Sequence, residues 1–263
     1  MIHWRVQPEL IDFGFLHIRW YGVMFLLGFS GGYQIMQRVY QAEGKDLEPL
    51  ADLLTQMILG TIIGARLGHC FFYEPGYFFS NPLEVFKVWN GGLASHGGAI
   101  GVLLVMAWHA KKHPATPFLW ILDRMMMPIA LTAGLIRIGN LMNSEILGKP
   151  TDGSWGFIFD HVDAIPRHPT QIYESFSYLA LLGILALIYR LKKPLPPGLL
   201  VGVAFIGLFG ARFSWEFFKE NQVAFEAGLP LNLGQFLSIP FFIFGIGMTI
   251  WSLKKPESGS ETT

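Results

Sequence analysis

The chain has 263 residues, of which 52% are hydrophobic and only 14% are charged, and its formal net charge is zero. Soluble domains carry about 25% charged residues, so this composition predicts a polytopic membrane protein. The neutral balance argues against a nucleic-acid partner. The single cysteine, Cys70, excludes an internal disulfide and a cysteine-based metal cluster.

Apolar segments long enough to cross a bilayer follow one another along the chain. We predict an all-α fold with one transmembrane domain at 1–253 and a cytoplasmic tail at 254–263. Its seven transmembrane helices are expected at Ile18–Met36, Leu53–Tyr73, Gly92–Trp108, Phe118–Leu141, Ile172–Tyr189, Leu199–Phe218 and Leu233–Leu253.

The basic residues of the loops indicate how these helices are oriented. The pairs Lys111-Lys112, Lys192-Lys193 and Lys254-Lys255 all fall on one side of the membrane if the N-terminus is outside. Because positively charged loops stay in the cytoplasm, we predict an N-out, C-in topology.

Two outer connections have a distinct composition. Residues 74–90 mix aromatic and aliphatic side chains with prolines and a few charges, which is typical of a segment in the membrane interface. Residues 144–169 form the longest loop and include the strand-like run Trp155–Phe159 between turns. Loops of this length are usually functional or disordered, and the aromatics favour a small ordered head between the fourth and fifth helices.

A glycine-rich stretch, Gly91–Gly101, places His96 at the outer end of the third helix. Glycines allow close approach of a backbone or a ligand, and an ionisable residue at membrane depth is a functional candidate. Gly97 and Gly98 would then give a lipid headgroup room. The alternative is a helix-packing face of small residues that carries a stranded histidine.

Two arginines, Arg137 and Arg212, lie near the outer ends of the fourth and sixth helices. A guanidinium group stays charged and binds phosphate oxygens in pairs, so the two would clamp a lipid phosphate. Helical spacing puts Arg137 and Asn140 on one face. The alternative is structural neutralisation of the arginines by carboxylates, for which the candidates are Glu145, Glu174 and Glu216.

Three other features have less specific signals. Arg66 is expected either to contact substrate or to pair with Asp52 or Glu74. Thr170 is a candidate cap for the fifth helix. Metal binding is not predicted, because the one His-x-x-x-His spacing, at 109–113, spans two lysines.

Six segments, in this order along the chain, resemble the bacterial prolipoprotein diacylglyceryl transferase family. They are Trp20-Tyr21-Gly22, Gly64-Ala-Arg66-Leu-Gly68, Gly91-Gly-Leu-Ala-Ser-His96-Gly-Gly, Arg137-Ile-Gly-Asn140-Leu-Met-Asn143-Ser-Glu145, Arg167-His-Pro-Thr-Gln-Ile-Tyr-Glu174 and Arg212-Phe-Ser-Trp-Glu216-Phe-Phe. Any one of them alone is a weak signal, whereas the ordered set is strong.

The resemblance implies transfer of the sn-1,2-diacylglyceryl group of phosphatidylglycerol to the lipobox cysteine thiol of a prolipoprotein signal peptide. A thioether forms and glycerol 1-phosphate leaves. The implied partners are these two substrates and membrane lipids, with no nucleic acid, metal or soluble cofactor. The implied location is the bacterial inner membrane, with the site facing the periplasm.

The implied catalytic residues are His96, Arg137 and Arg212. A thiol with a pKa of about 8.5 needs a base, which His96 supplies, and the arginines stabilise the leaving phosphate. The implied substrate-binding residues are Tyr21, Arg66, Gly97, Gly98, Asn140, Glu145, Gly148, Gln171, Tyr173 and Glu216.

The chain departs from the family pattern at two informative positions. Ser144 stands where the family usually has glycine, and Lys219 replaces a common arginine, which keeps the charge but loses the bidentate fork. A transporter that passes an anion along the buried arginines is the alternative function. The lack of a visible internal repeat counts against it.

Overall fold

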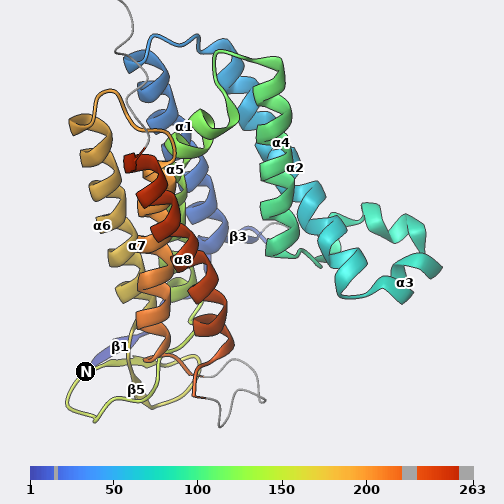
Figure 1. The fold of residues 1–263 in the computed structure, drawn as a ribbon. Helices are drawn as coiled ribbons and strands as arrows, with labels where there is room; N and C mark the ends of the chain where they lie inside the picture. Colours follow the sequence, from blue (N-terminus) through green and yellow to red (C-terminus); the bar gives the residue numbers. More distant parts are fainter. Residues whose placement is uncertain (15–16, 221–229, 255–263) are drawn as a thin grey trace, which may run out of the picture. The chain divides into compact units, whose positions relative to one another are not determined.

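The structure, a computed structural model, describes residues 1–14, 17–220 and 230–254. Eight α-helices lie within these ranges (Figure 1). They are α1 (Trp20–Ala42), α2 (Glu48–Phe72), α3 (Pro75–Ser80), α4 (Ser95–Lys112), α5 (Phe118–Met142), α6 (Thr170–Leu191), α7 (Leu199–Glu216) and α8 (Leu233–Lys254).

Five of the described helices are long and apolar enough to span a membrane, namely α2, α5, α6, α7 and α8. They coincide with five of the predicted spans. The first and third predicted spans are helical as α1 and α4, but α1 carries Gln34, Gln37 and Arg38 in its second half and α4 ends at Lys111-Lys112. The chain is therefore a mostly helical membrane protein, and the count of seven spans stays a prediction.

The expectation of an all-α fold is wrong in one respect, because the chain also forms two small sheets. In one sheet, β1 (Ile2–Trp4) pairs in parallel with β4 (Phe157–Phe159), which pairs antiparallel with β5 (Pro166–Arg167). In the other, β2 (Glu9–Asp12) and β3 (His17–Arg19) form a hairpin. The strand-like run at 155–159 is confirmed as β4.

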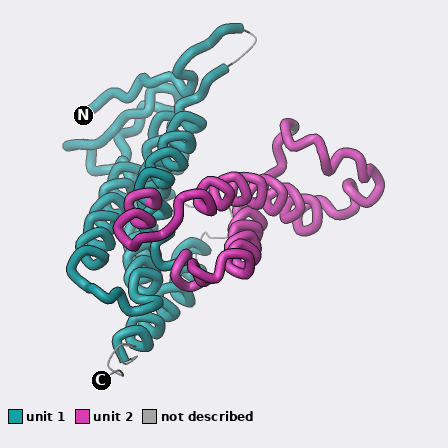
Figure 2. Tube along the Cα trace, turned by 90° about the horizontal axis from the view of Figure 1, so that it is seen from above, with its two compact units in different colours: residues 1–35, 123–263 teal, residues 36–122 magenta. Residues whose placement is uncertain are grey.

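The chain divides into two compact units (Figure 2). The first unit contains residues 1–35 and 123–263, and the second contains residues 36–122. The predicted transmembrane domain at 1–253 and the head at 144–169 stay predictions. The predicted tail lies, apart from Lys254, outside the described residues.

In the first unit, α7 packs between α6 and α8 (Figure 1). Asp123 of α5 fixes the start of α7, because its carboxylate accepts hydrogen bonds from the backbone N–H groups of Gly198, at 2.5 Å, and Val201, at 3.0 Å. This carboxylate is fully buried. An anion at a helix N-terminus satisfies otherwise unpaired N–H groups and interacts favourably with the helix dipole.

In the second unit, α2 and α4 pack along each other through glycines. A Cβ atom added at Gly97 would collide with the backbone of Gly64, and one added at Gly101 would collide with the backbone of Gly60. Small residues permit this close approach of helices in membranes. The contact holds the N-terminal end of α4 against α2.

Residues 74–90, which we call the arm, connect α2 to the segment before α4. The arm contains α3 and two short 3₁₀ helices, η1 (Pro82–Phe86) and η2 (Val88–Asn90). Most of its large apolar side chains are strongly exposed, with Phe79, Leu83 and Trp89 each 75% accessible, whereas Phe78 is buried. Such exposure is consistent with the interfacial location predicted from its composition.

Candidate active site

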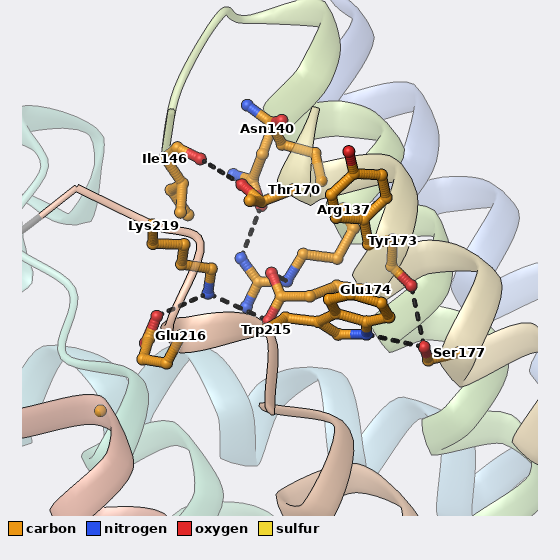
Figure 3. Close-up of polar contacts among 12 residues, drawn as sticks. Arg137, Asn140, Ile146, Thr170, Tyr173, Glu174, Ser177, Trp215, Glu216 and Lys219 are labelled. Carbon is orange, nitrogen blue, oxygen red and sulfur yellow. Dashed lines mark hydrogen bonds and ion pairs between the residues drawn. The ribbon is translucent and has the colours of Figure 1, made fainter. Parts of the chain in front are cut away.

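The polar residues predicted for the first unit gather where four of its segments meet (Figure 3). These segments are the end of α5, the loop 143–148, the start of α6 and the end of α7. Each contributes charged or amide side chains to one connected set of contacts.

Arg137, near the end of α5, has two side-chain partners. Its Nε lies 3.2 Å from Oε2 of Glu174, and its Nη1 donates a hydrogen bond to Oδ1 of Asn140 at 3.1 Å. The bond to Asn140 confirms that the two side chains share a helix face. Of the three carboxylates named as candidate partners of the arginines, Glu174 is the one that pairs with Arg137 among the described residues.

Glu145 belongs to the same network through amide groups. Asn140 donates from Nδ2 to Oε2 of Glu145 at 3.2 Å, and Asn143 donates to Oε1 at 3.0 Å. Glu145 therefore acts on Arg137 through Asn140, which is bonded to both. This arrangement fixes which way the Asn140 amide faces.

Glu174 lies between two cations (Figure 3). Its Oε1 is 3.0 Å from Nζ of Lys219 and accepts a hydrogen bond from the hydroxyl of Tyr178 at 3.2 Å. Lys219 is also 3.1 Å from Oε2 of Glu216. The sequence analysis assigned no role to Lys219. The one indication that this position matters was that a lysine replaces the arginine common in the family.

Arg212 differs from Arg137 in its surroundings. Its side chain is half-buried and, within the described residues, forms no ion pair or hydrogen bond. Arg212 lies one turn before Glu216 on α7, and Glu216 is linked through Lys219 and Glu174 to Arg137, so the two arginines belong to the same region of the first unit. Of the three carboxylates that the alternative interpretation named for the two arginines, none pairs with Arg212 in the described part of the chain, and Glu216 pairs with Lys219.

The start of α6 is tied to the loop after α5 by side chain to backbone bonds. Gln171 donates from Nε2 to the carbonyl of Glu145 at 2.6 Å, and the Thr170 hydroxyl donates to the carbonyl of Ile146 at 3.2 Å. The predicted cap role of Thr170 is wrong, because Pro169 occupies the N-cap position and Thr170 bonds the loop instead.

Tyr173 belongs to an aromatic cluster beside this loop. Its hydroxyl is 3.3 Å from Nδ1 of His168, and its ring centroid is 5.0 Å from that of Trp215. Trp215 in turn donates from Nε1 to the hydroxyl of Ser177 at 2.9 Å. The cluster fixes the relative positions of the start of α6 and the end of α7.

Gly148 lies at a close approach of two backbones. A Cβ atom at this position would collide with the carbonyl of His168. Gly148 also forms a β-bridge with Lys219, and its carbonyl accepts a hydrogen bond from Arg167 at 3.3 Å. A glycine is therefore required for this loop to pack against the backbone of His168.

Tyr21 lies in the first turn of α1 and packs over Gly139 of α5. A Cβ atom at Gly139 would come within 2.9 Å of the Tyr21 ring. The charges of Glu145 and Arg137 both act on the Tyr21 hydroxyl. The room left by Gly139 is therefore filled by Tyr21.

In the second unit, Arg66 is saturated by backbone carbonyls. It donates to Glu84 at 2.6 Å, to Val85 at 2.9 Å and to Gly91 at 2.6 Å. It also lies over the Phe78 ring, 4.9 Å from the centroid. The expected ion pair of Arg66 with Asp52 or Glu74 is wrong, because this guanidinium organises the arm and the segment before α4.

His96 is exposed in the first turn of α4, whereas Gly97 and Gly98 are buried against α2. The first unit thus holds Tyr21, Arg137, Asn140, Glu145, Gly148, Gln171, Tyr173, Arg212 and Glu216. The second unit holds Arg66, His96, Gly97 and Gly98.

One group of possible metal ligands occurs in the described part of the chain. Glu9, Asp12 and His17 lie together on the β2–β3 hairpin, and all three are exposed. The ion pairs that these residues form, His17 with Asp12 and Glu9 with Arg19, are within the hairpin itself, so we do not assign the hairpin to the candidate active site.

Helices that are long and apolar enough to span a membrane, together with a buried cluster in which arginine, lysine and carboxylates meet, indicate a multi-pass membrane protein with a buried polar site. The family profile described as prolipoprotein diacylglyceryl transferase matches residues 8–251. The chain belongs to this family, as the resemblance in its motifs predicts, and is a transferase of the first step of lipoprotein maturation.

Individual relatives agree over almost the whole chain. The chain is 47% identical over 255 residues to the phosphatidylglycerol–prolipoprotein diacylglyceryl transferase of Tolumonas auensis, which covers 97% of this chain and 99% of the relative. It is 47% identical over 257 residues to the enzyme of that name from Chloroherpeton thalassium, covering 97% and 96%. For the Bacteroides fragilis enzyme of the same name, identity is 39% over 267 residues, covering 97% and 96%.

Proposed function

We propose that the chain transfers the sn-1,2-diacylglyceryl group of phosphatidylglycerol to the lipobox cysteine thiol of a prolipoprotein signal peptide. The sulfur attacks the glyceryl carbon that carries the phosphate, a C–S bond forms, and the C–O bond to phosphate breaks. Glycerol 1-phosphate leaves with the bonding electron pair, and the thiol proton passes to a base. The substrates named for the relatives support this assignment.

The observation that carries the proposal is the set of ion pairs, Glu216–Lys219–Glu174–Arg137, that joins the last turn of α7, which bears Arg212, to Arg137 on α5. Arg212 has no anionic partner among the described residues. A phosphate group that gains negative charge as the C–O bond breaks would complete this arrangement. Fixed cations in a water-poor site stabilise such charge, and removal of one donor from a site of this kind costs roughly 3–4 kcal/mol of transition-state stabilisation.

We assign the base to His96, on chemical grounds. Imidazole is the side chain that exchanges a proton near neutral pH, and the exposed position of His96 at the start of α4 leaves it accessible to a substrate. The thiolate, not the thiol, is the nucleophile. If a His96→Gln variant kept its turnover from mildly acidic to mildly alkaline pH, the base assignment would be wrong.

The other predicted residues have supporting roles in this proposal. Asn140, oriented by Arg137 and Glu145, would bind the headgroup together with Tyr21, Gln171 and Tyr173. The remaining residues position the backbone segments that carry these groups. They are Arg66, Gly97, Gly98, Gly148 and, through Lys219, Glu216.

We further propose that α1 and α4 complete seven spans in the bacterial inner membrane, with the N-terminus, the head at 144–169 and the site toward the periplasm. The lysine pairs at 111–112, 192–193 and 254–255 support this orientation. The parallel pairing of β1 with β4 also supports it, since it joins the N-terminus to the head. Cysteine labelling from either side of sealed vesicles, at 152 in the head and at 193, tests the orientation.

The function is tested with purified protein, phosphatidylglycerol and a lipobox peptide, by measuring release of glycerol phosphate. Arg137→Ala and Arg212→Ala should fold, judged by thermal unfolding, and should lose activity by about 10²–10³-fold. Arg190→Ala, an exposed arginine at the other end of α6, is the matched control and should be active. Full activity of both site variants would contradict the clamp, and anion flux without lipid consumption would indicate a transporter.

A further inference from the structure

We infer that Glu174 is a positioning residue for Arg137, and that Lys219, the second cation on this carboxylate, holds Glu174 in place. The inference rests on the proposed function, because it concerns how Arg137 is presented to a phosphate. It assigns a role to two residues, Glu174 and Lys219, that motif reasoning left outside the site.

Glu174 is fully buried, with a side-chain exposure of 0%, and Lys219 is 3% exposed. A buried carboxylate is stable only when cations and hydrogen-bond donors satisfy it. Glu174 has three such partners on two oxygens, namely Arg137 at Oε2 and Lys219 and Tyr178 at Oε1. This carboxylate is consequently fixed in position by α5, α6 and the end of α7 together.

The contact holds Arg137 by one edge of its guanidinium. Oε2 of Glu174 is 3.2 Å from Nε in an ion pair without hydrogen-bond geometry, and Asn140 accepts a hydrogen bond from Nη1. In the described part of the chain, Nη2 has no side-chain partner, and the Arg137 side chain is 15% exposed. The arrangement therefore orients the group and leaves one nitrogen to donate to an incoming phosphate oxygen.

The charges around Glu174 explain why Lys219 is needed. With Arg137 as its one cation, the carboxylate would have only the Tyr178 hydroxyl at Oε1. Lys219 adds a second cation there and is itself paired with Glu216, so these four charges balance. Glu145, which is bonded to Asn140, and Arg212 add one charge of each sign, so a phosphate is attracted by where the guanidinium groups lie and not by excess positive charge.

Positioning and simple charge neutralisation predict opposite kinetic results for Glu174→Gln. The amide keeps the size and an acceptor for Tyr178 but removes one negative charge. A purely electrostatic role predicts tighter binding of the anionic lipid and unchanged turnover. A positioning role predicts that kcat falls roughly tenfold or more, with KM for phosphatidylglycerol unchanged or lower, because Arg137 is no longer held in its productive orientation.

The double variant Glu174→Gln/Lys219→Gln separates these roles, because it removes one charge of each sign. We expect KM to return to the wild-type value while kcat stays low, since Arg137 still lacks its anchor. Recovery of wild-type kcat in the double variant would overturn the inference, because Glu174 would then serve only to neutralise Lys219. Unchanged kcat in the single variant would overturn it as well.

Two further variants complete the experiment. Asp123→Asn removes a carboxylate that is equally buried but bonds only the start of α7, so it should lower the unfolding temperature without changing kcat of the folded enzyme. If Glu174→Gln does not fold, Glu174→Asp replaces it in the experiment. The aspartate keeps the negative charge but withdraws it from Arg137 by one methylene, so we expect the same fall in kcat. An unchanged kcat in this variant would overturn the inference. An active Arg137→Ala would instead reject the proposed clamp, whatever Glu174 does.

Discussion

Arg66 of α2 donates a hydrogen bond to the carbonyl oxygen of Gly91 at 2.6 Å, just before α4 begins at Ser95. The same guanidinium bonds Glu84 and Val85 within the arm. One side chain thus connects three parts of the second unit: α2, the arm and the segment that leads to His96. The planar fork of arginine spreads five N–H donors over three nitrogens, whereas the ammonium group of lysine has three donors on a single nitrogen and cannot span carbonyls that lie as far apart.

We therefore expect Arg66→Lys to loosen the arm and the start of α4 while α2 stays helical. Loss of two or three charge-assisted bonds should lower the unfolding free energy by about 2 kcal/mol or more. Amide hydrogen exchange at 84–96 should accelerate in the variant. Lys87→Gln, which removes only the exposed pair with Glu84, is the control and should leave exchange unchanged.

A second prediction uses two adjacent glycines with different surroundings. A Cβ atom at Gly97 would collide with the backbone of Gly64, whereas the nearest atom to a Cβ at Gly98 is Cγ2 of Thr61 at 3.5 Å. Gly97→Ala should therefore force α2 and α4 apart and lower the unfolding temperature, at a cost of roughly 1–3 kcal/mol. Gly98→Ala should be tolerated.

Thermal unfolding and turnover of the two variants measure this difference. Equal stability of the two would contradict the packing role of Gly97. A stable but inactive Gly98→Ala would instead support direct contact of this glycine with substrate.

The helices were predictable because their signal is continuous and local. The predicted span Phe118–Leu141 and the observed α5 differ by one residue at the end, and Leu199–Phe218 and α7 by two. The strands β1 and β2 had no such signal. They are short and exposed, and the partner of Ile2 is Phe157, far along the chain. Nothing in a local pattern identifies that pairing.

The site was predictable in its residue types but not in its connections. The motifs identified Arg137, Asn140 and Glu145, and helical spacing linked the first two. The partners of Arg66 are main-chain carbonyls, which every residue possesses, so no sequence pattern reveals them. The sharing of Glu174 by Arg137 and Lys219 depends on how α5, α6 and α7 pack, which only the fold specifies.

A third prediction concerns Ser144, in the loop after α5. Its φ of 53° is in the left-handed region, and its hydroxyl is buried without a hydrogen-bond partner among the described residues. A non-glycine residue in this conformation costs of order 1–3 kcal/mol. This conformation gives a physical reason for the glycine that the family usually has at this position.

Ser144→Gly should therefore raise the unfolding free energy by about 1 kcal/mol, since the gain exceeds the extra entropy of glycine in the unfolded chain. Ser144→Ala removes the buried hydroxyl but keeps the strained backbone, so the difference in stability between Ser144→Gly and Ser144→Ala isolates the conformational part. Chemical denaturation in detergent measures both. A destabilised Ser144→Gly would show that the serine side chain makes a favourable contribution.

The head should lose stability in acid, because Arg167 holds the carboxylate of Asp163 through two hydrogen bonds, one of 2.6 Å and one of 3.3 Å. These bonds lower the pKa of Asp163, and burial offsets only part of that effect. In the unfolded chain the same carboxyl titrates near pH 3.9. The stabilisation is therefore complete above about pH 4 and is lost as the pH falls through the lowered pKa of the folded state.

Hydrogen exchange of β4 and β5 between about pH 3 and pH 6, corrected for the intrinsic exchange rate, should show this loss of protection. Asp163→Asn removes the ionisable group, so its head should be less protected than the wild type near neutral pH and should change less on acidification. If the two proteins lost protection in parallel, the ion pair with Arg167 would not be the acid-sensitive element of the head.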